Sequence, residues 1–176
     1  MKKLTIFLLV CCMIAACSKD DTEYHPLRAS QISNTILMSY TDTEGNDMLS
    51  LDNVRNSIVI QGQYNKRLPF SVIKLSDNEK CQNYISIVAE LPDERSMFFN
   101  SDSTEAYGES RLNLTVGGET QMLKCRYRYV CTKMPDDEVY FGNSGIRIYS
   151  VEYNGITTKQ EKFNHLYVPL ICNISD

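Results

Sequence analysis

The sequence predicts an all-β domain over residues 31–176, an antiparallel β-sandwich of seven to ten strands, immunoglobulin-like or related. Three observations predict it. Short segments alternate apolar and polar residues with the period of two that is typical of half-buried strands. Turn residues interrupt these segments at intervals of roughly 8 to 15 residues. No segment has a convincing helical pattern, since the best candidate by length, 54–61, contains the β-branched run Ile58-Val59-Ile60.

Four strands are predicted in the first half of the domain, at 32–40, 57–63, 68–75 and 83–91. The polar residues 42–47 form a turn after the first of them. Their oxygen-rich side chains also suggest a calcium loop. An EF-hand loop counted from Asp42 needs Gly at its sixth position and Glu at its twelfth, where this chain has Asp47 and Asn53. The turn is therefore preferred.

The clearest local prediction is a long hairpin over 111–133. An alternating apolar strand ends at Gly117-Gly118, and glycines supply the positive φ angles that a two-residue hairpin turn requires. The register of that turn places Leu112 opposite Leu123. The returning strand then has five residues on the core face: Leu123, Cys125, Tyr127, Tyr129 and Cys131.

Three basic residues fall on the opposite face of the returning strand: Lys124, Arg126 and Arg128. We expect them to be solvated and partly paired with carboxylates across the sheet, and as a row they are also candidate contacts for an anionic ligand. The polar segment 100–110 is predicted to be a surface loop. Tyr107 within it is the fourth candidate ligand contact.

The C-terminal third contains a strand at 146–153, a hairpin turn at Asn154-Gly155 and a short returning strand at 156–159. The acidic residues 135–138 form a solvated loop before it. A last strand is predicted at 167–174, where Pro169 indicates an edge position because proline has no N–H to donate to a neighbouring strand.

The N-terminus is read as a signal peptide. Lys2 and Lys3 precede an apolar run, 4–14, which is too short to span a bilayer because a spanning helix needs about 20 residues. The run ends in Ile14-Ala-Ala-Cys17, which resembles the lipobox of bacterial lipoproteins. The resemblance implies that residues 1–16 are removed, that Cys17 receives the lipid, and that 17–30 form a flexible tether between membrane and domain.

Three further segments resemble Bacteroidetes-type surface lipoproteins. Cys17-Ser-Lys-Asp-Asp21 is similar to their acidic export tag, 42–49 to their Asp-x-x-Gly-x-Asp-Leu-Leu motif with Met48 in place of a leucine, and 151–155 to their Tyr-Asn-Gly hairpin. The resemblance implies a β-sandwich that is lipid-anchored in the outer membrane and displayed on the cell surface. Attachment on the periplasmic side is the alternative.

The net charge limits the possible partners. The formal net charge is −4, and loss of Lys2 and Lys3 makes the mature chain more acidic, which disfavours nucleic acid as a partner.

Four cysteines fall in the domain: Cys81, Cys125, Cys131 and Cys172. Cys125 and Cys131 share a predicted strand, roughly 20 Å apart, so each could form a disulfide only with one of the other two. Four reduced thiols are the equal alternative.

No cofactor, metal or catalytic residue is predicted. The chain has no C-x-x-C pair, His25 and His165 lack the spacing of zinc ligands, and nucleophile and phosphate-binding motifs are absent from the sequence. The first hypothesis is therefore a non-enzymatic, membrane-anchored binding module for a glycan or protein ligand. The second is a structural subunit of a surface appendage, which predicts an exchanged terminal strand. A hydrolase is the third.

Overall fold

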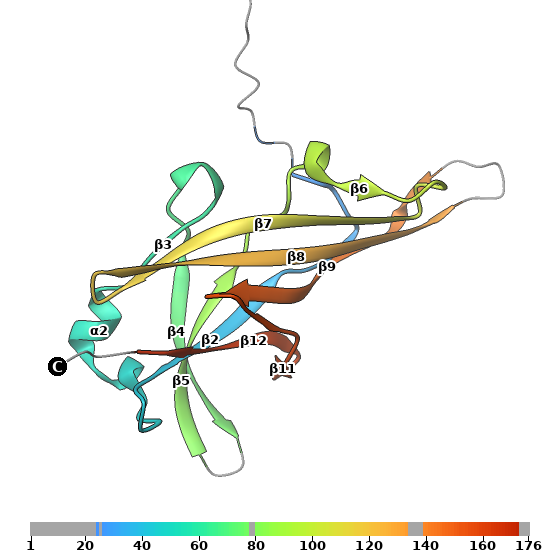
Figure 1. Ribbon diagram of the computed structural model, residues 1–176. Helices are drawn as coiled ribbons and strands as arrows, with labels where there is room; N and C mark the ends of the chain where they lie inside the picture. The colour runs from blue at the N-terminus through green and yellow to red at the C-terminus, as the bar shows by residue number, and fades with distance from the viewer. Residues whose placement is uncertain (1–23, 25, 78–79, 134–138, 173–176) are drawn as a thin grey trace, which may run out of the picture.

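The computed structural model describes residues 24, 26–77, 80–133 and 139–172, which form two packed β-sheets (Figure 1). The signal peptide, Cys17, the acidic tag, His25 and the acidic loop at 135–138 lie outside the described residues. The sandwich-like all-β fold predicted from the sequence is confirmed. Within the described chain, the longest helix has only five residues, and no helix is long and apolar enough to cross a membrane.

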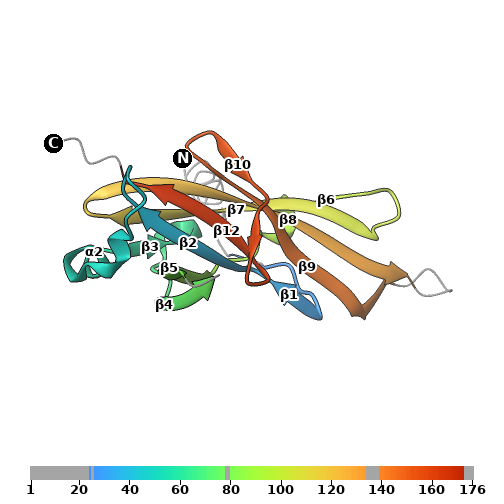
Figure 2. The same ribbon diagram turned by 90° about the horizontal axis from the view of Figure 1, so that it is seen from below.

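The large sheet has seven strands. Its main path runs β1 (Gln31–Ser33), β9 (Val139–Tyr153), β8 (Glu119–Lys133), β7 (Glu105–Val116) and β3 (Val59–Gln61), while β10 (Ile156–Thr158) pairs with β9 and β6 (Phe98–Phe99) with β7. The small sheet runs β11 (Glu161–Lys162), β12 (His165–Ile171), β2 (Thr35–Thr41), β5 (Lys80–Val88) and β4 (Phe70–Asp77). Seen from below, β7, β8 and β9 extend beyond the small sheet (Figure 2).

Four short helical segments complete the described chain: η1 (Met48–Ser50), α2 (Asp52–Asn56), η2 (Gln63–Asn65) and η3 (Glu94–Ser96). The sequence predicted no helix, so α2 is a correction. Its residues lie just before the β-branched run that argued against a longer helix, and Asp52 in its first turn favours a helix start.

The antiparallel prediction is wrong for two strand pairs. β1 runs parallel to β9 and β12 runs parallel to β2, so both sheets are mixed, and twelve strands are present in the described residues instead of seven to ten. The predicted strand 32–40 is divided at Asn34, whose side-chain amide donates to Ala89 O at 2.6 Å. Each part joins a different sheet, which alternation within one segment cannot reveal.

The hairpin register is confirmed. Leu112 lies opposite Leu123, and Gly117 and Gly118 take φ angles of +61° and +88° at the turn. The second hairpin is confirmed too, with Tyr153 opposite Ile156 across Asn154-Gly155. One boundary differs, because β7 begins at Glu105 and half of the predicted loop 100–110 is strand.

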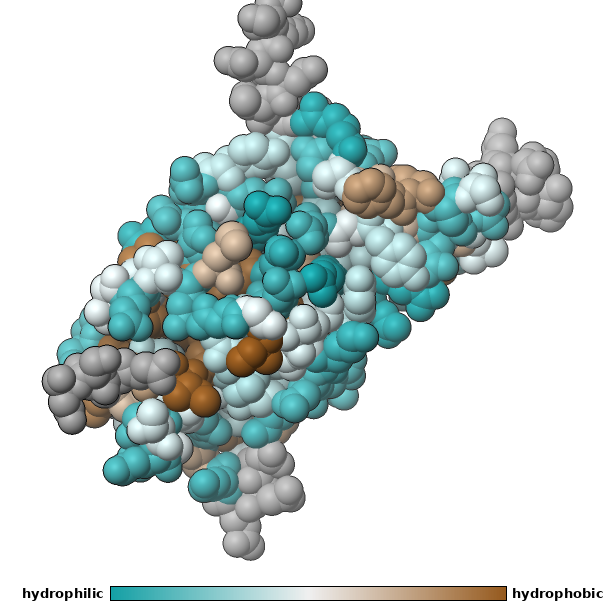
Figure 3. All heavy atoms as spheres, in the orientation of Figure 1, coloured by the Kyte–Doolittle hydropathy of each residue, from teal (hydrophilic) through white to brown (hydrophobic). Residues whose placement is uncertain are grey.

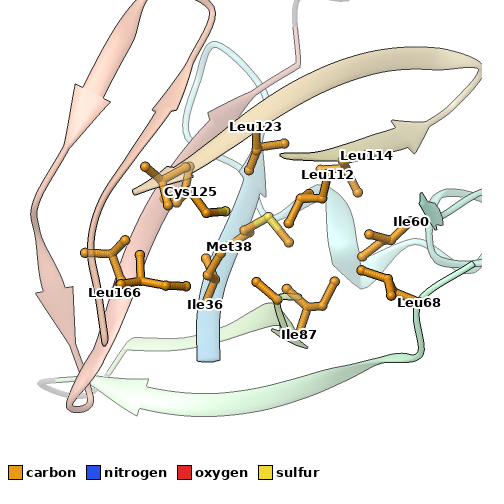
Figure 4. Close-up of a cluster of buried hydrophobic side chains, with 14 of the residues drawn as sticks. Ile36, Met38, Ile60, Leu68, Ile87, Leu112, Leu114, Leu123, Cys125 and Leu166 are labelled. Carbon is orange, nitrogen blue, oxygen red and sulfur yellow. The ribbon is translucent and has the colours of Figure 1, made fainter. Parts of the chain in front are cut away.

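The core lies between the sheets (Figure 4). Ile36 and Met38 of the small sheet face Leu112, Leu123 and Cys125 of the large sheet, and all five are at most 2% exposed. Buried aliphatic side chains of this kind each contribute about 1.5–3 kcal/mol to folding. The face of β8 that the sequence assigned to the core is therefore the buried one, and its opposite face is left for other contacts.

Part of the outer face of the small sheet is covered by the chain itself. Lys162 of β11 places its Nζ 5.2 to 5.7 Å from the ring centres of Tyr84, Phe163 and Tyr167, and donates a hydrogen bond to Tyr84 Oη at 2.7 Å. Tyr84 is consequently 1% exposed. This cation–π cluster holds the β11 turn over the part of the sheet around Tyr84.

Pro169 lies in β12, which has a neighbouring strand on each side and is not an edge strand. At residue 169, however, one side of β12 has no strand partner among the described residues. β11 pairs only with His165 and Leu166, and Tyr167 N donates to Gln160 O on the β11 side. Residue 169 points its nitrogen to the same side, beyond the end of β11. The missing N–H therefore interrupts no ladder hydrogen bond.

Residues 26–30 correct the predicted length of the tether. Leu27 is 5% exposed, Pro26 bridges to Asp93, and the Ser30 hydroxyl donates to Ser144 O at 2.6 Å. The chain is thus attached to the large sheet before β1 begins. An apolar residue in an otherwise polar segment was the only signal of this in the sequence.

Residues 42–49 form a turn that is held by hydrogen bonds to its own side chains, and not a cation-binding loop. Asp42 Oδ1 accepts hydrogen bonds from the N–H groups of Glu44 and Asn46, and these bonds, with the Asn46 side chain, lower the Asp42 pKa. Asp47 caps η1 by accepting from Leu49 N at 3.0 Å. Its other oxygen accepts from the backbone and side chain of Asn83 at 2.9 and 2.8 Å, which ties the turn to β5.

We expect Asp47→Ala to lower the free energy of unfolding by about 1–3 kcal/mol, because it removes a helix cap and leaves the Asn83 donors without this acceptor. Urea unfolding of the purified protein measures the change. The matched control is Glu44→Ala, an exposed carboxylate in the same turn, which should stay within about 0.5 kcal/mol of wild type. Equal stability of the two variants would contradict the role of Asp47.

Candidate ligand-binding face

The outer face of the large sheet carries the residues that the sequence singled out. Tyr107 projects from β7, and Lys124, Arg126 and Arg128 project from β8, all on the side away from the core. The hairpin register predicted this face for the three basic residues, whereas Tyr107, expected in a surface loop, lies in β7 directly opposite Arg128. An apolar patch lies over β6 in the view of Figure 3, where most of the surface is hydrophilic. Phe98 and Phe99, both exposed, form this patch.

Carboxylates across the sheet pair with the basic row, also as predicted. Glu152 of β9 pairs with both Lys124, at 3.5 Å, and Arg126. Glu105 of β7 accepts from Arg128 Nε at 2.5 Å and from the Tyr107 hydroxyl. The hydrogen bonds from Tyr107 and Arg128 lower the Glu105 pKa. Each of the three cations therefore has an ion-pair partner within the sheet, although Lys124 and Arg126 share one carboxylate.

A β-bulge decides what else reaches this face. The register of β8 and β9 shifts between Arg126 and Tyr127, which leaves Tyr149 as an extra residue on β9. Strict alternation would put Arg147 and Glu152 on opposite faces. The bulge places both on the outer face, and it sets the Tyr149 ring edge-on to Tyr107, with centres 6.1 Å apart.

One cross-strand row spans five strands of this face: Phe98, Tyr107, Arg128, Arg147 and Ser33. Phe98 is 80% exposed and Tyr107 is 44% exposed. Sequence reasoning identified only Tyr107 and Arg128, because β6 has two residues and the β1–β9 pairing is parallel. The aromatic pair Phe98-Phe99 was the available signal.

The first hollow on the face lies at the β1 end of this row. It has a volume of about 390 Å³ and is lined by Gln31, Ile32, Ser33, Arg128, Val130, Gly145, Ile146 and Arg147. We call it the arginine hollow.

The second hollow lies at the other end of the row, between β7 and the segments η2 and η3. It has a volume of about 610 Å³ and is lined by Gln63, Tyr64, Asp93, Arg95, Ser96, Phe98, Glu109 and Arg111. We call it the aromatic hollow, because Tyr64 and Phe98 expose 59% and 80% of their surface in it. An adjoining hollow of about 310 Å³ shares Gln63, Tyr64 and Arg111.

Tyr64 lies on a strained backbone segment. Tyr64 and Asn65 have φ angles of 60° and 58°, a left-handed conformation that is rare for an aromatic residue. Glu90 anchors the segment by accepting from Gln63 N at 2.6 Å, and it occupies the space that a Cβ on Gly62 would need. Strain of this kind persists where surrounding contacts enforce it, and it is concentrated at functional sites.

The carboxylates of the aromatic hollow are ion-paired. Asp93 accepts from Arg95 Nε and Nη2 at 3.1 Å each, and Glu109 pairs with Arg111 at 3.3 Å. The hollow therefore presents carboxylates held by arginine, guanidinium groups and an amide, an arrangement that suits hydrogen bonding to hydroxyl groups.

Other chemistries find little support in the described residues. No three His, Cys, Asp or Glu side chains lie close enough there to hold a metal ion. His165 is in β12 of the small sheet, in the sheet opposite both hollows. Cys81, Cys125, Cys131 and Cys172 are all free thiols. Burial raises the pKa of Cys125 to about 12, so this thiol is a small apolar core group and not a nucleophile.

Comparison with known proteins gives no relative, since no family model, curated protein or solved structure matches this chain. The class that the fold defines is an all-β, sandwich-like domain with two mixed sheets. The face described above must therefore be interpreted from its own geometry.

Proposed function

We propose that this protein is a lipid-anchored, non-enzymatic saccharide-binding protein of the outer membrane, displayed on the cell surface. The lipobox-like segment ending at Cys17 and the acidic tag behind it support the anchor and its location. The observation that carries the binding function is the aromatic hollow, where Tyr64 and Phe98 stand exposed beside planar polar side chains.

Saccharides fit this arrangement chemically. A sugar ring has C–H faces that pack on aromatic rings. Its hydroxyl groups accept hydrogen bonds from guanidinium and amide N–H groups and donate them to carboxylates. The hollow has the size of a small-molecule site, which is typically about 300–1,000 Å³. Arg95, Arg111 and Glu109 supply the polar groups. In the free protein, Phe98 exposes apolar surface to water, which is unfavourable. A bound ligand would cover that surface.

The second candidate, a structural subunit of a surface appendage, is less well supported. An exchanged terminal strand needs an unpaired strand at one end of the domain and a gap in the sheet to receive it. β1 pairs with β9, and β12 pairs with β2 over six residues, so the first and last described strands are used within the domain.

The test is binding of the mature protein to immobilised neutral polysaccharides, namely xyloglucan, mannan and β-glucan, followed by Tyr64→Ala and Phe98→Ala. We expect each variant to weaken binding about tenfold, equivalent to about 1.4 kcal/mol, by removing a stacking ring. Because Phe98 is 80% exposed, its loss should leave thermal unfolding unchanged.

The matched control is Phe163→Ala, an aromatic residue that is 38% exposed on the small sheet. It should bind as wild type does. Undiminished binding by the Tyr64→Ala/Phe98→Ala double variant would refute the aromatic hollow as the site. Release of reducing sugar from a bound polysaccharide would refute the non-enzymatic assignment.

A further inference from the structure

Two arginines face each other at the β8–β9 pairing. Arg128 lies directly opposite Arg147, and both are on the outer face of the large sheet. Like charges directly opposite each other destabilise a sheet. Glu105 compensates Arg128, whereas Arg147 makes no ion pair within the described part of the chain. One positive charge is therefore left without a counter-charge at this point.

The hollow beside this pair exists because of a glycine. Gly145 lies between Val130 on β8 and Gln31 on β1, and a Cβ built on it would meet only Gln31 O, at 4.0 Å. A Cβ there would make only ordinary van der Waals contact. Its φ is not in the left-handed region, so the backbone does not require glycine there. The absence of a side chain leaves the arginine hollow open.

The charged residues that line the arginine hollow are all positive. Arg128 and Arg147 supply two guanidinium groups, Gln31 and Ser33 supply neutral polar groups, and no lining residue is acidic, although the chain as a whole has a net charge of −4. Guanidinium groups bind carboxylate and sulfate through paired hydrogen bonds. A volume of about 390 Å³, with Val130 as an apolar wall on the same face, admits the ring that carries such a group as well.

The arginine hollow is joined to the aromatic hollow by the cross-strand row. From Arg128 the row continues to Tyr107 and then to Phe98, which lines the aromatic hollow. Neighbouring strands lie about 4.8 Å apart, so these three side chains follow one another at intervals close to the length of one sugar residue. A chain of sugars lying across the strands could contact both hollows.

We propose that the arginine hollow binds the carboxylate or sulfate group of an acidic saccharide whose chain extends over Tyr107 and Phe98. This inference rests on the proposed saccharide-binding function. The ligand is an acidic polysaccharide, recognised by one anionic ring beside Arg147 and by stacking of its neighbours.

The experiment compares the full mature protein with Arg147→Gln and Gly145→Val on three probes: polygalacturonate, chondroitin sulfate and neutral galactan. We expect wild type to prefer an acidic probe, and both variants to lose about tenfold in affinity for it while binding of galactan is unchanged. Gly145→Val fills the hollow and favours a strand, so it should fold normally. Lys74→Gln, a cation removed from the small sheet, is the control and should change nothing.

A second measurement tests the arginine hollow alone. The side-chain Nε–H signal of Arg147 in NMR should shift on titration with galacturonate or with galactose 6-sulfate and should not shift with galactose; the two acids separate carboxylate from sulfate recognition. A signal that responds to neither acid overturns this inference. Binding of neutral polysaccharides with no effect of Arg147→Gln on acidic ones also overturns it while the proposed function stands. Failure of every polysaccharide to bind overturns the proposed function itself.

Discussion

Replacing Cys17 with alanine is expected to abolish fatty-acid labelling of the protein and to remove it from the outer-membrane fraction. The lipobox-like sequence makes the Cys17 thiol the proposed attachment point for diacylglycerol. Each buried CH₂ contributes about 0.8 kcal/mol to membrane binding, and stable attachment takes at least two membrane signals, such as two acyl chains. Loss of the thiol removes all of them at once. Metabolic labelling with an alkyne fatty acid and membrane fractionation measure the two effects.

The signal peptide itself offers the matched control. Cys12→Ala removes a neighbouring thiol from the apolar run but leaves the lipobox-like residues 14–17 intact. It should be labelled and localised as wild type is. A mature N-terminus elsewhere than residue 17, found by mass spectrometry, would contradict the lipoprotein assignment, as would unchanged labelling of Cys17→Ala.

The second large effect is expected in the core. Leu123 is 0% exposed, and it lies between Leu112 on β7 and Tyr153 on β9. Leu123→Ala should lower the free energy of unfolding by about 2–5 kcal/mol, because it removes buried methyl groups and leaves a cavity that packed sheets cannot close. A loss of this size is a large part of the stability of a single domain, typically about 5–15 kcal/mol.

Met122→Ala is the matched control for the core prediction. Met122 is the adjacent residue on the same strand, its side chain points to the outer face, and it is 50% exposed. Its replacement should change stability by less than about 0.5–1 kcal/mol. Denaturant unfolding measures both variants. If the two changes were equal, the assignment of the β8 faces would be wrong.

Much of the local structure could be predicted because its causes are local. Gly117-Gly118 and Asn154-Gly155 set hairpin registers through their own backbone angles, and period-two alternation then assigned Leu123 to the core and Arg128 to the outer face. The same reasoning placed Lys124 and Arg126 beside acidic cross-strand partners, which Glu152 confirms.

The hollows could not be predicted in the same way. Alternation tells which face a side chain takes but not which strand lies beside it, so Arg128 and Arg147 could not be known to be neighbours. The bulge at Tyr149 also breaks the alternation that would have assigned Arg147 its face. Tyr64 could not be identified from the sequence because its segment has positive φ angles and is bound by Glu90, 26 residues further along the chain.

The sequence by itself determined the all-β class, the two hairpins and the register of the first, since each of these depends on residues close together in the chain; the lipobox-like segment at Cys17 stays a prediction of the same local kind. Only the tertiary structure decided the two parallel pairings, the row from Phe98 to Ser33 and the openings at its two ends. Those features arise where strands distant in sequence meet, and the free energy that selects the partners comes from burying one shared core.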